Sequence, residues 1–406
     1  MQERTDIAII GGGMVGGMLA CALGDSHYRV IVLEAGSQPS FAPTDDYSLR
    51  VSALSLASQR MLECTGAWAG VIDRRACPYR RMRVWDGTGS GQTDFDSGNI
   101  AETHLGHIVE NHVLQLALYE RAVEFENIEW RSGSRLENID VSDESARVTL
   151  DSGGSFDAKL IVGADGARSL VRSLCGIEAV GSVYEKQHAL VATVETDEGQ
   201  QDITWQRFVP AGPQALLPLC GHRASIVWYN TPEEVARIKT LSDDEFIAEM
   251  QEAFPAELGD VNLIVGRGSF PLSYQHATHY VKPRIALIGD AAHSIHPLAG
   301  QGVNLGLLDA ATLAEVLLGQ KGKGDAGSLL ALRRYERWRK TQNIAMQSLI
   351  DGIYKAFDAQ QTPIKFARNA LLNAANEISA INRLCMRYAS GVDGDLPKLA
   401  RGVPIL

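Results

Sequence analysis

The feature that most constrains this chain is a glycine-rich turn near its start, Gly11-x-Gly13-x-x-Gly16. The turn follows a short apolar run at positions 7–10 and opens a stretch of helix-forming residues, 14–23. A second apolar run, 30–33, ends in Glu34, whose carboxylate can accept hydrogen bonds from a ribose. This order predicts a βαβ unit that binds the pyrophosphate of a dinucleotide at the helix N-terminus. Glu34 argues against a 2′-phosphate, so NAD or FAD is favoured over NADP, and the motif alone does not choose between them.

The same stretch has an alternative interpretation, because residues 7–24 carry no charge over a length that could suggest a membrane span or a signal-peptide core. Six of these residues are glycine, and Glu3 and Asp6 come directly before them. A nucleotide-binding turn explains these glycines better than a membrane helix does.

Two later segments repeat the pattern of an apolar strand followed by glycine and an acid. The first runs from 159 to 169 and contains Asp165, and taken alone it fits an ordinary β–α turn as well. The second runs from 284 to 306, with Asp290 after its strand, and a glycine-bearing loop leads into an apolar helix, 303–318. Gly300 and Gly302 would let the backbone approach a flat ligand. A dehydrogenase that uses only a nicotinamide does not need this third element, whereas the long FAD molecule does, so FAD is the predicted cofactor.

These segments resemble the class A flavoprotein aromatic hydroxylases, typified by para-hydroxybenzoate hydroxylase. The resemblance covers nearly the whole chain, and its most specific part is the run from His296 to Asp309, which is similar to the ubiquinone-biosynthesis branch. The runs 78–82, 204–208 and 228–229 are most similar to the hydroxylases of 2-polyprenyl-3-methyl-6-methoxy-1,4-benzoquinol. The sister enzymes that act on 2-polyprenylphenol share the runs at 105–111 and 188–193, so both subfamilies stay open.

The resemblance implies roles for individual residues. The pyrophosphate of FAD would lie on the first glycine turn, the adenosine ribose on Glu34, and the isoalloxazine on the third segment. Many class A hydroxylases carry an arginine near position 111, where this chain has Glu110 and Asn111, so that contact is not carried over. The residues expected to contact the cofactor are Gly11, Gly13, Met14, Val15, Gly16, Glu34, Arg50, Asp165, Asp290, Pro297, Gly300, Gly302, Val303 and Asn304.

The implied fold is α/β, with a Rossmann-like FAD-binding domain, an inserted antiparallel-sheet substrate domain and a helical C-terminal region. The FAD domain is expected to be discontinuous, at 1–75, 100–180 and 270–330. The substrate domain would comprise 76–99 and 181–269, where apolar and polar residues alternate, and 331–406 would be helical. The aromatic side chains Trp205, Phe208, Trp228 and Tyr229 are candidates for the substrate wall, and core packing is at least as good an interpretation for each.

The helical tail contains an apolar stripe at three- and four-residue spacing: Met346, Ile350, Ile353 and Phe357. Packing within the chain is the favoured explanation, with a subunit interface or a membrane-surface contact as the alternatives.

Histidines do not predict a metal site. His104, His107 and His112 lie close in sequence, but no carboxylate or cysteine completes a ligand set. We expect a structural role for His293, while His296 is as well placed to lie near the flavin. No catalytic residue is assigned, and a general base for the substrate hydroxyl cannot be identified from the residues.

The predicted activity is FAD-dependent hydroxylation of the aromatic ring of a polyprenylated benzoquinol or phenol in ubiquinone biosynthesis, through a flavin C4a-hydroperoxide. Its partners would be that substrate, O2 and a transiently bound reduced nicotinamide. The alternatives are hydroxylation of polyprenylphenol or of a small soluble aromatic acid, a flavin-binding scaffold of a biosynthetic complex, and a nicotinamide-only dehydrogenase.

Composition narrows the partners and the compartment. The chain has 38 Lys and Arg against 49 Asp and Glu, a net charge of −11, so nucleic-acid binding is not expected. Six scattered cysteines without a C-x-x-C pair suit free thiols in a reducing cytoplasm. Membrane contact is expected to be peripheral at most, at the inner membrane, and a homo-oligomer or a biosynthetic complex is left open.

Overall fold

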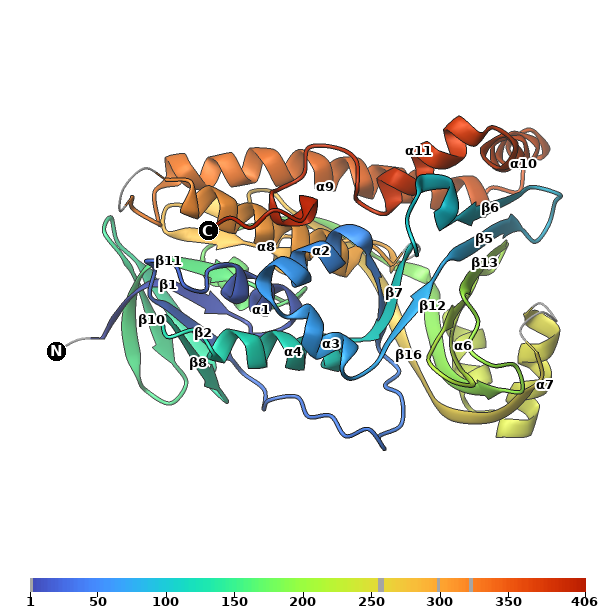
Figure 1. Ribbon diagram of the computed structural model, residues 1–406, viewed down its shortest axis with the longest axis horizontal. Coiled ribbons are helices and arrows are strands. Elements are labelled where there is room, and N and C mark those ends of the chain that lie inside the picture. Colours follow the sequence, from blue (N-terminus) through green and yellow to red (C-terminus); the bar gives the residue numbers. More distant parts are fainter. Residues whose placement is uncertain (1–2, 255–258, 298–299, 321–323) are drawn as a thin grey trace.

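The computed structural model describes residues 3–254, 259–297, 300–320 and 324–406. Two large sheets lie side by side, and a long helix, α9 (Leu329–Asp358), runs past both (Figure 1). The first sheet has the order β17-β18-β11-β1-β2-β8, and β10 and β9 extend it beside β11. Its strands are β1 (Arg4–Ile10), β2 (Val30–Glu34), β8 (Ile128–Ser132), β9 (Leu136–Val141), β10 (Ala146–Leu150), β11 (Ser155–Gly163), β17 (Val281–Lys282) and β18 (Ile285–Leu287).

The centre of the first sheet is parallel, since β1 pairs in parallel with β2 and β11, and β11 with β18. Residues 7–10 of β1 and 30–33 of β2 are almost completely buried, as expected for parallel strands that are covered on both faces. Helices α1 (Met14–Ala22), α4 (Asn111–Val123) and α8 (Gly302–Leu318) pack together over this sheet. The predicted βαβ unit is therefore present, and its helix ends one residue before the predicted end, with Leu23 as its C-cap.

The second sheet has the order β19-β16-β12-β15-β14-β13-β5-β6, and its neighbours are antiparallel except for the pair β13 and β5. Its two longest strands, β12 (Ala179–Thr196) and β16 (Val261–Ala277), pair over most of their length. The other strands are β5 (Arg81–Asp86), β6 (Gln92–Asp96), β13 (Ile203–Val209), β14 (Gly212–Pro218), β15 (Arg223–Asn230) and β19 (His293–Ser294).

The two faces of the second sheet have different partners. On one face Trp205 and Trp228 pack in a core that includes residues of α6 (Pro232–Lys239) and α7 (Asp243–Ala253). These two tryptophans are therefore core residues. Phe208 and Tyr229 point to the opposite face, because side chains alternate along each strand. Of the four aromatic candidates for the substrate wall, only Phe208 and Tyr229 are placed to contribute.

Shorter elements connect these layers. A third, three-stranded sheet consists of β3 (Val51–Ser55), β7 (Gly106–Glu110) and β4 (Ala76–Tyr79), in the order β3-β7-β4. The remaining helices are α2 (Leu56–Thr65), α3 (Trp68–Ile72), α5 (Leu170–Leu174), α10 (Thr362–Glu377) and α11 (Ser379–Ala389), and 3-10 turns lie at Ser97–Ile100, Gly289–Ala291 and Leu399–Arg401.

The tail is helical, as predicted, and its apolar stripe packs inside the molecule. Ile350 is buried in a cluster with Phe208, Ile295 and Leu305, and Met346, Ile353 and Phe357 pack against that cluster. Within the described residues, none of the helices combines the length and the apolar character that a bilayer crossing requires.

Candidate functional site

The first glycine turn depends on glycine at two positions for steric reasons. Gly11 has a φ of +103°, and a Cβ there would lie 2.4 Å from the carbonyl oxygen of Ala164. A Cβ on Gly16 would lie 1.9 Å from the carbonyl oxygen of Gly11. Gly13 differs, because the atom nearest to a Cβ placed there would be 3.8 Å away, on Gln115. Gly11 and Gly16 thus bring strand, turn and helix into contact, and Gly13 leaves space above the N-terminus of α1.

No side chain caps the N-terminus of α1, and no acidic residue lies in its first turn. The N–H groups of that turn, together with the helix dipole, therefore form a site that suits a pyrophosphate. Met14 and Val15, the first residues of the helix, are partly buried against the main core. Val15 also contacts the third segment, because a Cβ on Gly289 or on Gly306 would meet its side chain at 3.1 Å or 2.6 Å.

A cavity of about 280 Å³ continues from this turn along the end of β2. At its edge Glu34 accepts hydrogen bonds from the N–H of Gly12 (2.8 Å) and of Gly36 (2.7 Å). Trp130 of β8 and Tyr119 of α4 line the same cavity and meet edge to face, with 5.2 Å between ring centroids. An acid at the end of a strand beside two aromatic rings suits the ribose and adenine of a dinucleotide.

Sequence analysis missed the aromatic part of this cavity. Gln115, Tyr119 and Trp130 come from α4 and β8, some 80 residues or more after Glu34 in the chain. These residues reach the cavity because β8 pairs beside β2. The order of strands in the sheet decides this pairing, and the local sequence does not show it.

The second segment places Asp165 immediately after β11. Its Oδ2 accepts from the N–H groups of Leu170 (2.7 Å) and Val171 (3.1 Å) at the start of α5. Its Oδ1 is buried and has no hydrogen-bond partner among the described residues. One oxygen of this carboxylate therefore holds the local turn, and the other is available to a ligand.

The third segment brings Asp290 to the end of β18, next to the first glycine turn. The Asp290 side chain is exposed, yet the surrounding protein limits its hydration and raises the pKa of its carboxyl above the ordinary value. His293 and Arg50 act in the opposite direction and lower this pKa, which places the Arg50 guanidinium in the same electrostatic environment. Arg50 and Asp290, 240 residues apart in sequence, are thus close enough for their charges to interact.

The start of α8 is held by the side chain of Asn304. Its Oδ1 accepts from the backbone N–H of Ser55 (3.0 Å) and from the Ser58 hydroxyl (2.7 Å), and its Nδ2 donates to the carbonyl of Ala53 (2.9 Å). The Asn304 amide is therefore occupied by β3 and α2, so a contact with a cofactor would have to come from its backbone.

The neighbouring residues leave room for a ligand. Among the described residues, a Cβ on Gly302 would meet nothing within 4 Å, and Gly300 has a φ of +60°. Val303 is partly buried against the main core, and Pro297 is the last described residue before positions 298 and 299.

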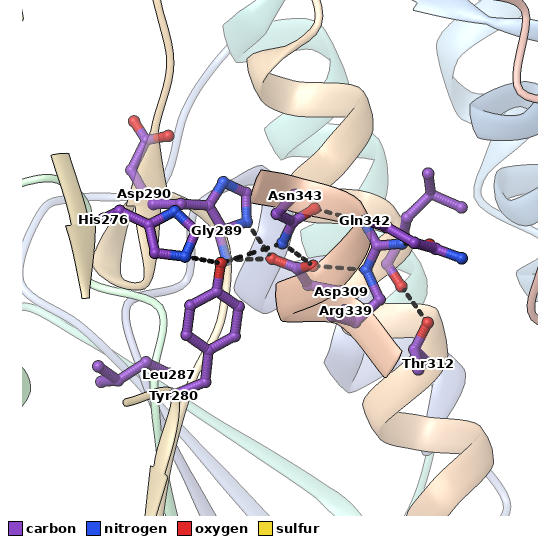
Figure 2. A network of polar contacts seen from close by, with 12 residues as sticks. His276, Tyr280, Leu287, Gly289, Asp290, Asp309, Thr312, Arg339, Gln342 and Asn343 are labelled. Carbon is purple, nitrogen blue, oxygen red and sulfur yellow. Dashed lines mark hydrogen bonds and ion pairs between the residues drawn. The ribbon is translucent and has the colours of Figure 1, made fainter. Parts of the chain in front are cut away.

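A buried polar network lies directly behind this loop (Figure 2). Asp309 is fully buried, and its Oδ2 accepts from Nε2 of His293 (2.6 Å) and from the N–H of Gly289 (3.1 Å). Its Oδ1 accepts from Nε of Arg339 (2.7 Å) and from Nδ2 of Asn343 (3.1 Å), both on α9. Burial alone would raise the pKa of Asp309, but His293 and Arg339 more than offset it and lower this pKa to about 2.

The structural role expected for His293 is confirmed by this network. Sequence analysis did not foresee Arg339 or Asn343, because they lie on a different helix, in a stretch whose sequence resembles a charged helix surface. The network ties Gly289, the residue before Asp290, to both α8 and α9.

His296 lies in a cluster of aromatic rings at the other side of the loop. Its ring centroid is 4.7 Å from that of Tyr184 on β12, 5.2 Å from Tyr354 on α9 and 5.7 Å from Tyr229 on β15. Burial lowers the pKa of His296 to about 4, so its imidazole is neutral near pH 7. Burial also raises the pKa values of these three tyrosines, so all three keep their protons.

Glu110 and Asn111, which replace the arginine of many class A hydroxylases, support the backbone around Arg50. Glu110 is buried, accepts from the N–H of Ser48 (2.6 Å) and forms an ion pair with Arg75 (3.2 Å). Asn111 accepts from the Ser52 hydroxyl (2.7 Å).

No group of three or more metal-binding side chains occurs among the residues that the structure describes. His104 and His107 do lie together, with 4.4 Å between ring centroids. Burial, together with the nearby His104, lowers the pKa of His107 to about 4.

The sequence profile of the protein family described as "FAD binding domain" matches residues 4–348. The chain belongs to this family. Its cofactor is FAD, and it is an FAD-dependent monooxygenase of the ubiquinone-hydroxylase branch of the class A flavoprotein hydroxylases. The glycine turn, the cavity at Glu34 and the open backbone at Gly302 fit bound FAD.

Two curated relatives are similar over almost the full length. The 3-demethoxyubiquinol 3-hydroxylase of Escherichia coli is 38% identical, over 96% of this chain and 100% of the relative. The ubiquinone hydroxylase UbiL of Rhodospirillum rubrum is 36% identical, over 100% of this chain and 94% of the relative. Among solved structures, the p-nitrophenol 4-monooxygenase PnpA of Pseudomonas putida superposes with a TM-score of 0.78 at 20% identity, over 97% of this chain and 99% of that one. This last likeness confirms the predicted fold class.

Proposed function

We propose that this chain hydroxylates the aromatic ring of a polyprenylated benzoquinol or phenol intermediate of ubiquinone biosynthesis, with O2 and a reduced nicotinamide as co-substrates. The observation that carries the proposal is the full-length similarity to relatives named for ubiquinol or ubiquinone hydroxylation, on a chain whose cavity beside Glu34 suits the adenosine part of a dinucleotide. The polyprenyl tail of the substrate and the nicotinamide as electron donor are parts of this proposal.

In the proposed arrangement FAD lies along the three segments. Gly11, Gly13, Met14, Val15 and Gly16 would hold its pyrophosphate, Glu34 its adenosine ribose, and Arg50, Asp165 and Asp290 its central part. Pro297, Gly300, Gly302, Val303 and Asn304 would contact the isoalloxazine through their backbone or apolar atoms. When bound, the flavin supplies the activation of oxygen, which amino-acid side chains cannot supply.

The residues of the chain then have three tasks. The N-terminus of α8, with no acid in its first turn, stabilises negative charge near the flavin ring. The rings of Tyr184, Tyr229 and Tyr354 would exclude water from the ring end, because all three pack against the imidazole of His296. The neutral imidazole of His296 can accept a hydrogen bond but carries no charge near the substrate.

We propose the division into domains that the sequence predicted. The segments 1–75, 100–180 and 270–330 would form the FAD domain, 76–99 and 181–269 the substrate domain, and 331–406 the helical region. In support, β5 and β6 join the second sheet.

The test is the quinone profile of a strain that lacks the gene. Mass spectrometry should show loss of ubiquinone and accumulation of a demethoxylated intermediate lacking one hydroxyl group, both restored by the wild-type gene. Accumulation of a prenylphenol would instead assign the sister reaction. Normal ubiquinone in the deletion strain would contradict the proposal, and complementation by a variant that binds no FAD would favour a scaffold.

A further inference from the structure

Two of the cysteines, far apart in the sequence, meet where the third sheet adjoins the second. Cys77 lies on β4, and Cys220 lies in the turn between β14 and β15. Both are free thiols, and they are hydrogen-bonded to each other, with the S–H of Cys77 as the donor and the sulfur of Cys220 as the acceptor. The fold therefore forms a dithiol that the spacing of the cysteines in the sequence does not indicate.

The two thiols differ in their access to solvent. Cys77 is 1% exposed and packs in a small apolar cluster with Ile108 and Leu219. Cys220 packs at the edge of that cluster and is partly exposed. A small solute can therefore reach Cys220 from outside, whereas the buried Cys77 is placed to react with its neighbour.

The polar surroundings of Cys220 favour its thiolate. The Tyr47 hydroxyl donates to the Cys220 carbonyl oxygen (3.4 Å) and also lies within hydrogen-bonding reach of its sulfur. The guanidinium carbon of Arg75 is 4.3 Å from the centroid of the Tyr47 ring, and its Nη2 is buried without a hydrogen-bond acceptor among the described residues. The pKa of Cys220 is lowered to about 6, first by the hydrogen bond from Cys77 and further by these two side chains, against the effects of burial and of Glu110.

The thiol pair is connected to the proposed ring end of FAD by one row of side chains. Cys77 of β4 and Ala53 of β3 both pair with Ile108 of β7, so the three side chains lie next to one another on the same face of the third sheet. At the end of this row, a Cβ on Gly300 would meet the Cβ of Ala53 at 3.6 Å. Gly300 belongs to the loop proposed to contact the isoalloxazine.

The chemistry of an FAD-dependent monooxygenase also provides an oxidant for these thiols. When reduced flavin reacts with O2 and no oxygen atom is transferred to a substrate, hydrogen peroxide is released. A partly exposed thiol with a low pKa beside a second thiol is typical of sites that react with peroxide. This argument depends on the enzyme class and not on the proposed ubiquinone precursor.

We propose that Cys220 is a peroxide-reactive thiol and that Cys77 converts its oxidised form to a disulfide. The Cys220 thiolate attacks one oxygen of hydrogen peroxide, the O–O bond breaks, and Cys220 becomes a sulfenic acid while hydroxide leaves. The Cys77 sulfur then attacks the Cys220 sulfur, the S–O bond breaks, and the Cys77 proton leaves with the hydroxyl group as water. Two thiols thereby lose two electrons, and one peroxide is reduced to two molecules of water. The disulfide would tie the β14–β15 turn to β4.

The experiment is oxidation of the fully reduced, FAD-loaded protein with hydrogen peroxide at pH 7, followed by digestion without reductant and mass spectrometry. We expect one cross-linked pair of peptides, which contains Cys77 and Cys220 and which dithiothreitol converts back to free thiols. The cross-link should form at least about tenfold faster than Cys385 is oxidised. Cys385 is exposed, but its pKa is raised above the ordinary thiol value, so it provides little thiolate.

Two variants separate the roles of the two thiols. Cys77→Ser keeps a hydrogen-bond donor beside Cys220 but cannot form the disulfide, so Cys220 should stay as a sulfenic acid that dimedone labels. Cys220→Ser should leave Cys77 as a free thiol. Cys64→Ser is the matched control, because it makes the same change at a partly exposed cysteine on α2, and it should form the cross-link at the wild-type rate.

Equal flavin absorbance and thermal midpoints would establish that the variants are folded, and the wild-type digest tests the cross-link even if one of them is not. The proposal is overturned if peroxide oxidises Cys385 before Cys220, or if oxidised wild type contains no peptide that links Cys77 to Cys220. It is also overturned if Cys64→Ser abolishes the cross-link, or if dimedone fails to label Cys220 in folded Cys77→Ser.

Discussion

The two ends of the proposed FAD site are built in different ways. The adenosine end uses a continuous βαβ unit, in which Gly11, Gly16 and Glu34 lie within 24 residues of one another. The ring end is assembled from distant segments, since Asn304 is bonded to Ser55 and Ser58, and Asp309 to Arg339. At the first end the backbone forms the binding surface, and at the second a buried polar network holds the backbone in place.

This difference predicts which substitutions should damage each end of the site. Backbone contacts are lost only when a side chain is introduced or the strand ends shift, so the adenosine end depends on the absence of side chains. A buried network fails when one partner is removed, because the others lose their compensation. Substitutions should therefore separate cofactor affinity from folding stability.

The largest effect is expected for Gly16→Val. Its Cβ would lie 1.9 Å from the carbonyl oxygen of Gly11, a backbone atom that cannot move without displacing the turn. We expect loss of more than about 3 kcal/mol of folding free energy and almost no bound flavin. Flavin absorbance of the purified protein and thermal unfolding measure both. Gly352→Val is the control, since this glycine is exposed on α9 and a Cβ there meets nothing within 4 Å among the described residues, and a comparable loss there would break the proposed contrast.

Asp309→Asn should be the next largest. Arg339 and His293 would lose their buried counter-ion, which should destabilise the fold by about 3–5 kcal/mol. Urea unfolding measures this change. Gln342→Ala, on the same helix, removes a more exposed neighbour of Arg339 and should cost much less. Equal costs for both variants would show that Asp309 does not organise the network.

The same carboxylate gives a pH dependence. Its pKa is lowered in the folded state to about 2 from an ordinary value of 3.8, so its stabilising contribution is complete above pH 4 and is lost as the pH falls toward 2. The shift corresponds to about 2 kcal/mol. Urea unfolding at pH 5, 4 and 3 should show wild type approaching Asp309→Asn in stability, and parallel curves would contradict this assignment.

Glu34→Gln tests the adenosine end with a smaller expected effect. The amide can accept from only one of the N–H groups of Gly12 and Gly36, and it carries no charge toward a ribose. We expect FAD affinity to fall about tenfold with little change in the stability of the FAD-free protein. Fluorescence titration with FAD gives the affinity. Glu126→Gln, at an exposed position, is the control and should leave the FAD affinity unchanged. If Glu34→Gln lost as much stability as Asp309→Asn, the distinction between the two ends would be wrong.

His296→Phe should have the smallest effect at neutral pH, because the contribution of this imidazole appears only as the solution becomes acidic. The pKa of His296 is lowered to about 4, so the folded state binds fewer protons than the unfolded state between pH 4 and 6.5. Wild-type stability should therefore decrease as the pH falls through this range, by up to about 1.4 kcal/mol per pH unit from this group. The variant should lack that contribution in urea unfolding. If proton NMR showed the imidazole of His296 titrating near pH 6.5, the lowered pKa would be contradicted.

The sequence was informative wherever a function depends on neighbouring residues. The strand at 7–10, the glycine turn and Glu34 could be predicted together, because a tight turn and a backbone-bound phosphate impose glycine at fixed spacing. The stripe at 346–357 could be predicted as internal packing for a similar reason, since helical periodicity is local. The alternation in 224–229 predicted a strand, but not which face Trp228 and Tyr229 would use.

The rest depended on which segments the fold brings together. Tyr119 and Trp130 reach the adenosine cavity because β8 pairs beside β2, and Arg339 reaches Asp309 because α9 crosses α8. Helix α10 shows the limit most directly: the sequence predicted only that 331–406 is helical, and the tertiary structure shows that Asn369, Asn373 and Asn376 face inward. Periodicity identifies two faces of a helix, but the side that is buried is decided by the hydrogen bonds its neighbour requires, here those of an edge strand.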